Sequence, residues 1–133
     1  MNIHQQQYYS EMALKDRLFM FYHNDRKVCL ITYFIDNDKD KYIREDMWQV
    51  LNDNPQGKIC IIDHLLTDKN PINPKLSYKI WHYFKEHIRK NFPQVENIFW
   101  IRAKLNPNSL TRDRKTYIKS LKGVEDVHSK TVR

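Results

Sequence analysis

Short apolar runs and helical patterns of apolar positions alternate along this chain. The apolar runs at 18–22 and 28–35 flank the polar segment 23–27, a pattern typical of an antiparallel β-hairpin. Residues 59–66 are almost continuously apolar, which favours a strand covered on both faces of a sheet. The segment 76–90 is predicted to be a long amphipathic helix, because its apolar residues recur at helical spacing: Leu76, Ile80, Phe84 and Ile88.

The central part of the chain has the order of a parallel strand–helix–strand unit. The strand at 59–66 and the helix at 76–90 are followed by a second apolar strand at 97–103, and such a unit needs about 30 residues or more. Units of this kind bind ligands beyond the carboxyl ends of their strands. Asp63 and His64 lie near the end of the first strand, so two titratable groups are predicted at that edge.

The remaining patterns predict three further helices. They cover residues 5–15, 43–51 and 111–121, and the turn residues 54–57 end the second of them. The whole pattern predicts a single domain over residues 1–133, with an α/β fold in which a mixed sheet carries helices on both faces.

Composition narrows the classes of partner. The hydrophobic fraction of 41% and aromatic fraction of 13% favour a packed globule. There are 23 Lys and Arg against 16 Asp and Glu, a net charge of +7, which suits nucleic acid, a phosphorylated cofactor or an acidic carrier protein. With only two glycines, Gly57 and Gly123, the chain cannot build a Gly-rich phosphate loop. Any bound phosphate must be held by helix N-termini or by Lys and Arg side chains.

Several features favour a soluble cytoplasmic protein. Cys29 and Cys60 lie in apolar, strand-like runs, as expected of buried thiols in a reducing compartment. The N-terminal residues lack the basic and apolar regions of a signal peptide. No apolar run approaches the roughly 18 residues that a membrane span requires. Nothing in the sequence predicts a tightly bound cofactor.

A weaker pattern resembles the HNH nucleases. Asp63 and His64, then Asn73, then His82 follow the order of that motif, in which one His activates water and other residues hold a metal. The positive charge would suit DNA. The glycines and short strand of the motif are missing, however, and His82 lies beside the apolar stripe of the long helix. The two cysteines are too far apart for a zinc cluster, so no metal site is predicted.

A broader resemblance covers residues 59–123, which look like the C-terminal half of the GNAT-type acyltransferase fold. In that fold a central strand precedes a helix whose N-terminus receives the acyl carrier, and an Asn…Tyr…Gly pattern follows. Asn108, Tyr117 and Gly123 stand here in that order, with wider spacing. The pyrophosphate loop of the family is absent, and residues 68–74 take its place. The resemblance therefore implies GNAT-like topology without the usual acetyl-CoA loop.

One branch of the fold that also lacks the loop is similar over a longer stretch. The toxin-activating lysine acyltransferases, which take acyl groups from acyl carrier protein, have an early His, a strand pair, an inserted helix and a strand ending in Ile-Asp. This chain matches them at His4 and Asp63, at the end of the long helix (90–93) and at the strand end 101–102. It is shorter than those proteins and lacks their usual residues around the early His.

The resemblance implies transfer of an acyl group from a thioester carrier, acyl carrier protein or acyl-CoA, to a protein amine. His4 would be the base and Asp63 would fix its tautomer, with His64 as an alternative base. Tyr117 would be the general acid that protonates the leaving thiolate. The phosphate of the carrier would be held near the N-terminus of the long helix by three lysines: Lys69, Lys75 and Lys79.

Each of these residues also has a simpler structural interpretation. His4 is near a terminus, Asp63 can form a local polar contact, Tyr117 can be a core residue, and the lysines can be solvated charge. The chain as a whole can likewise be a catalytically inactive GNAT-like module that binds nucleic acid or a larger protein assembly. Its three Trp and eight Tyr could then supply an interface or stack on bases.

Overall fold

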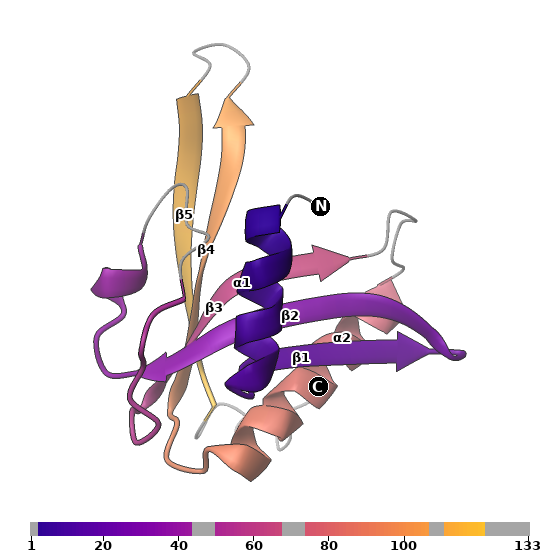
Figure 1. Ribbon diagram of the computed structural model, residues 1–133, viewed down its shortest axis with the longest axis horizontal. Coiled ribbons are helices and arrows are strands. Elements are labelled where there is room, and N and C mark those ends of the chain that lie inside the picture. Colours follow the sequence, from indigo (N-terminus) through magenta and orange to yellow (C-terminus); the bar gives the residue numbers. More distant parts are fainter. Residues whose placement is uncertain (1–2, 44–49, 68–73, 107–110, 122–133) are drawn as a thin grey trace, which may run out of the picture.

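The computed structural model describes residues 3–43, 50–67, 74–106 and 111–121, and for 74, 102–106 and 111–115 the backbone only. Figure 1 shows the elements in chain order, which are α1 (Ile3–Leu14), β1 (Leu18–His23), β2 (Arg26–Asp36), a 3-10 turn (Asp40–Tyr42), β3 (Ile59–Thr67), α2 (Pro74–Asn91), β4 (Asn97–Asn106) and β5 (Thr111–Ser120). No helix in these ranges is both long enough and apolar enough to cross a membrane.

The strands form one mixed sheet in the order β1-β2-β3-β4-β5. Neighbouring strands are antiparallel except for β3 and β4, which are parallel and are joined by the crossover helix α2. The predicted hairpin, the central position of β3 and the parallel unit are therefore confirmed. The sheet separates two apolar cores, one under each helix.

Each face of the sheet is covered by one helix, as predicted (Figure 1). On one face α1 buries Tyr8 and Met12 against a cluster that includes Phe34 of β2. On the other face α2 buries the apolar stripe of the long helix, including Phe84 and Ile88, against a second cluster. The stripe repeats at helical spacing, so it faces the sheet along the whole length of α2.

The helix predicted at 111–121 is wrong. Residues Thr111–Ser120 form strand β5, which pairs with β4 in an unbroken antiparallel register from Asn97↔Ser120 to Asn106↔Thr111. The run Thr116-Tyr117-Ile118 is rich in residues that fit a pleated surface, and pairing with β4 decides its conformation. Of the helix predicted at 43–51, residues 44–49 lie outside the described residues, and residues 50–54 have no regular structure.

A buried ion pair fixes the segment that precedes β3. Arg17 Nε lies 2.7 Å from Asp53 Oδ2, and the same oxygen accepts a hydrogen bond of 2.7 Å from the backbone N–H of Ile35. The Arg17 guanidinium also lies 4.8 Å from the centre of the Phe92 ring. The ion pair and the Ile35 hydrogen bond hold Asp53 against β2, beside Arg17, which lies between α1 and β1 in the chain.

Candidate functional site

Asp63 occupies a β-bulge in the central strand. Tyr33 of β2 pairs with Ile62 and Thr32 pairs with His64, so Asp63 is the extra residue between two paired positions. A bulge interrupts the alternation of side chains along a strand. As a result both Asp63 and His64 lie on the α1 face. Asp63 accepts a hydrogen bond from Tyr8 of α1, and the His64 ring lies 5.2 Å from the Tyr8 ring.

A directed chain of hydrogen bonds connects the bulge to α1. The backbone N–H of His64 donates to Thr32 Oγ1 at 3.1 Å, and Thr32 Oγ1 lies 2.8 Å from the Tyr8 hydroxyl. Tyr8 donates its own proton to the Asp63 carboxylate. Since Tyr8 has only one hydroxyl proton, Thr32 is the donor in the middle bond. The chain therefore runs from His64 through Thr32 and Tyr8 to Asp63.

Burial gives the Asp63 carboxyl unusual proton affinity. Its side chain is 9% exposed, and desolvation raises its pKa, although the Tyr8 hydrogen bond and the nearby His64 lower it in part. Burial together with the charge of Asp63 also raises the pKa of Tyr8. His64 Nε2 lies 3.7 Å from Asp63 Oδ2 and its side chain is 24% exposed, so the imidazole connects the buried carboxyl to the surface. Perturbed titratable groups of this kind are common at functional sites.

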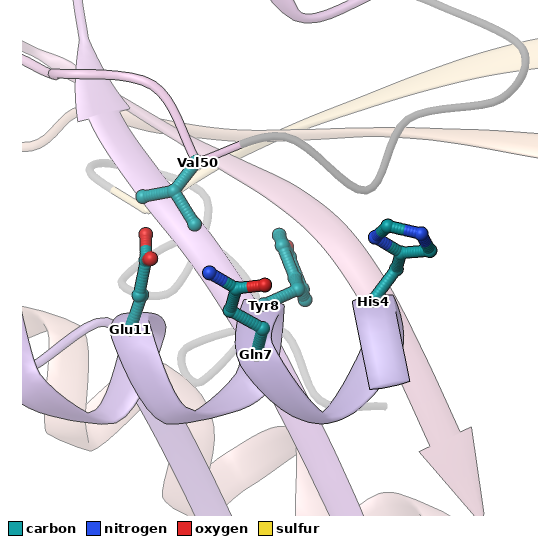
Figure 2. Close-up of a pocket in the computed structure, with 5 residues that line it drawn as sticks. All are labelled: His4, Gln7, Tyr8, Glu11 and Val50. Carbon is teal, nitrogen blue, oxygen red and sulfur yellow. The ribbon is translucent and has the colours of Figure 1, made fainter. Parts of the chain in front are cut away.

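A small polar hollow lies beside α1, between the helix and Val50. His4, Gln7 and Glu11 project from the helix on the side of Val50, with Tyr8 behind them (Figure 2), and the hollow has a volume of about 190 Å³. His4 is exposed, and the structure shows no hydrogen bond between His4 and Asp63 in the described residues; Tyr8 donates to Asp63 Oδ2. Tyr8 therefore belongs both to the hollow and to the hydrogen-bond chain.

The sheet splits beside the bulge. Strands β3 and β4 pair only at Ile59↔Asn97, Cys60↔Ile98 and Ile61↔Phe99, and then β4 continues with β5 alone. Figure 1 shows the β4–β5 hairpin rising away from the other strands. Beyond the split, β3 and β4 each have a backbone edge that faces the other strand. No described strand pairs with either edge there. This is the carboxyl end of a parallel pair, the usual ligand position in such sheets.

The structure separates Tyr117 from the bulge. Tyr117 lies on β5, and its ring stacks on Trp100 with centroids 5.3 Å apart and planes 9° apart. Trp100 packs on the core under α2, on the face opposite Asp63. Lys75 and Lys79 are exposed in the first turns of α2, while Lys69 lies outside the described residues, as do Asn108 and Gly123.

The HNH-like arrangement is not assembled. His64 contacts Tyr8 on the α1 face, whereas His82 is an exposed residue of α2, on the other face of the sheet. Asn73 lies outside the described residues. Within the described part of the chain, no group of three or more His, Cys, Asp or Glu side chains is placed to hold a metal ion.

The sequence does not predict Tyr8 and Thr32 as residues of this site. They lie 55 and 31 positions before Asp63, and their sequence neighbourhoods predict only a helix face and a strand. One sequence feature could have pointed to Thr32, namely a polar Thr within the apolar run of β2. A hydroxyl that is fully buried there requires a hydrogen-bond partner.

Comparison with known proteins supports the fold. No protein-family model and no curated protein match the sequence. Among solved structures, the loading GNATL domain of CurA from Lyngbya majuscula matches with a TM-score of 0.58 and 13% identity, over 78% of this chain and 53% of that chain. The GphF GNAT-like decarboxylase in complex with isobutyryl-CoA matches with a TM-score of 0.52 and 11% identity, over 77% of this chain and 64% of that chain.

The predicted GNAT-like topology is therefore confirmed at the level of the fold. This chain spans 53% and 64% of the length of the two structures. These two matches bear on the fold and do not test the toxin-activating branch.

Proposed function

We propose that this protein transfers an acyl group from a thioester carrier to a protein amine. The observation that carries the proposal is the split between β3 and β4, which opens directly beside the bulge that presents Asp63 and His64. The two backbone edges, which no strand of the described residues pairs, offer hydrogen bonds to an extended, amide-containing arm, in the way that sheet edges bind extended peptides. Such an arm carries the thioester in acyl-CoA and in acyl carrier protein.

The reaction requires one proton acceptor beside the thioester carbonyl. The amine nitrogen attacks the carbonyl carbon, the carbon–sulfur bond breaks, and the amine proton passes to an imidazole. We assign this role to His64, because Asp63 lies 3.7 Å from Nε2 and stabilises the imidazolium that forms. The imidazolium then protonates the leaving thiolate, which makes a distant Tyr117 unnecessary. His4, in the hollow beside Tyr8, is the second candidate for the base.

The donor in this proposal is acyl-CoA or acyl carrier protein. The GphF structure holds isobutyryl-CoA, which supports a thioester of that type. Lys75 and Lys79, at the N-terminal end of α2, would attract the phosphate of either carrier. The lack of a Gly-rich loop in the sequence favours acyl carrier protein and, with it, the toxin-activating branch. A cytoplasmic location is part of the same proposal.

The test is a thiol-release assay with acyl-CoA and acyl carrier protein offered separately, in the presence of a lysine-containing peptide, with the peptide mass read afterwards. We expect His64→Ala to lower the rate about 10²-fold or more, as for other general bases, while His23→Ala, an exposed His on β1, leaves it unchanged. If His4→Ala rather than His64→Ala abolishes transfer, the base is His4. If neither donor binds or reacts, the proposal is wrong.

A second candidate function is binding of nucleic acid by a catalytically inactive module. It is favoured by the β4–β5 hairpin, whose strands contain two and four Lys or Arg residues against a single Asp. A basic two-stranded ribbon fits the major groove of DNA. Binding of a DNA duplex that weakens steeply with salt, without any acyl-donor binding, would favour this function over acyl transfer.

A further inference from the structure

A shallow groove runs along the free edge of β1, next to the N-terminal half of α2. Its volume is about 440 Å³, within the range of ligand pockets, and five of its lining residues are the consecutive residues Phe19 to His23. The other two are Lys79 and Tyr83 of α2. Because β1 ends the order of described strands, the groove follows a backbone edge that no described strand pairs.

Several apolar and aromatic side chains along the groove are exposed. Met20 is 43% exposed, Tyr22 is 56% exposed and Tyr83 is 53% exposed. The ring centroids of Phe21 and Tyr83 lie 5.8 Å apart, so these two residues form an aromatic wall between β1 and α2. Proteins usually shorten, cover or charge such an edge, because it readily pairs with another strand. Residues 18–22 of this edge carry no charge, although the pairing of β1 with β2 has a register shift between Phe21 and Tyr22.

The surroundings of the groove are basic. Lys79 and His23 line it, and Lys75 lies one helical turn before Lys79. Helix α2 has five Lys or Arg residues and a single acidic residue, Glu86, which forms an ion pair of 2.6 Å with Arg89. The turn between β1 and β2 and the start of β2 add two cations and one acid, namely Arg26, Lys27 and Asp25. A ligand that lies along β1 therefore meets net positive charge at this end.

We propose that this edge binds an extended, acidic segment of another protein as an added strand. The backbone of β1 would supply hydrogen bonds, the aromatic wall would receive an apolar side chain, and Lys79 would attract acidic side chains. A second copy of this chain fits less well, since each copy has a net charge of +7. Nucleic acid also fits less well, because only one Lys lines the groove and the main feature is a strand edge.

The test is a titration of ¹⁵N-labelled protein, observed by NMR, with a short capped peptide that alternates glutamate with valine and phenylalanine. We expect shifts at the amides of β1 and the N-terminal half of α2. Lys79→Glu should weaken binding about three- to tenfold, as expected when an exposed attraction becomes a repulsion. Lys90→Glu, at the other end of α2, is the matched control and should change affinity less than about twofold.

Two control ligands separate edge pairing from simple charge attraction. A peptide with lysine in place of glutamate should not bind, and a peptide with alternate amides N-methylated should lose binding because it cannot donate hydrogen bonds to the edge. Equal binding of either peptide would overturn the proposal. So would shifts confined to β5, stronger shifts at β1 with oligo(dT), or a concentration-dependent dimer that forms through β1. None of these outcomes depends on acyl transfer.

Discussion

The buried carboxyl group of Asp63 makes the stability of this protein depend on pH in a direction that can be measured. Its side chain is 9% exposed, and burial raises its pKa above the ordinary value of 3.8. Replacement of Asp63 by Asn keeps the shape of the side chain and an oxygen that can accept the Tyr8 hydrogen bond, but it removes the titrating proton. We expect the Asn variant to gain stability relative to the unchanged protein as pH rises.

The sign of this pH dependence follows from the number of protons that the folded and the unfolded states bind. With a raised pKa, folded Asp63 keeps its proton above pH 3.8, where the unfolded carboxyl has released its own. The favourable contribution is complete below the unfolded pKa and is lost as pH rises through the folded pKa. Each unit of pKa elevation corresponds to about 1.4 kcal/mol. A change of that size shifts the melting temperature of a domain this large by roughly 4 °C or more, which is easily resolved.

Asp36 provides a control of opposite sign. It is also a buried carboxyl that accepts a hydrogen bond from a buried tyrosine, since the Tyr42 hydroxyl lies 2.6 Å from Oδ2. Burial acts to raise its pKa, but donation by Lys41 and Tyr42 outweighs burial and holds the pKa below 3.8. Its contribution is therefore present above the unfolded pKa and is lost as pH falls below it. The stability difference caused by Asp36→Asn should change only in acid.

The assay is urea unfolding followed by tryptophan fluorescence, at a series of pH values from about 3 to 9, for the unchanged protein and both variants. For Asp63→Asn, the difference in unfolding free energy should shift in favour of the variant above about pH 4 and then level off. A difference that is independent of pH, or one that favours the variant only in acid, would refute the argument that Asp63 is desolvated beneath α1.

Two further changes test contacts that hold the fold around the site. Gly57→Ala should lower the unfolding free energy by about 1–3 kcal/mol, because an added Cβ would overlap the backbone of Asp36; unchanged thermal stability would contradict that packing. Arg17→Met should cost about 3–5 kcal/mol, because it leaves the buried Asp53 carboxylate without its cation. The double variant with Asp53→Asn should recover part of that loss in urea unfolding, and additive losses would show that the two side chains are not coupled.

Much of the fold could be predicted because its main elements have long, regular patterns. The apolar stripe of α2 and the continuous apolar run of β3 each point to a single structure, and a helix between two strands favours a parallel pair. The segment 111–121 was predicted incorrectly because Tyr117, Ile118 and Leu121 also fit one helical face. Ten paired positions with β4 override that short pattern, and such long-range pairing cannot be read from local spacing.

The candidate site could be predicted only in part, for a related reason. The sequence predicts Asp63 and His64 as site residues because the end of a parallel strand is a general ligand position. The partner of Asp63 was assigned to His4, whereas the structure places the Tyr8 hydroxyl there, one helical turn further along α1. The two alternatives differ only in how α1 is rotated and placed over the sheet. That placement depends on contacts with Thr32 and the rest of the core, and the helix sequence alone does not determine it.

The bulge at Asp63 connects the shape of the sheet with its chemistry. One extra residue in β3 puts two polar side chains in succession on the α1 face, where regular alternation would have turned one of them into the core under α2. A bulge also bends its strand and increases the local twist. Pairing with β4 stops at Ile61, two residues before the bulge, so the bend lies where the split begins. If acyl transfer is the function, the same distortion opens the space for the donor and orients Asp63 and His64 toward it.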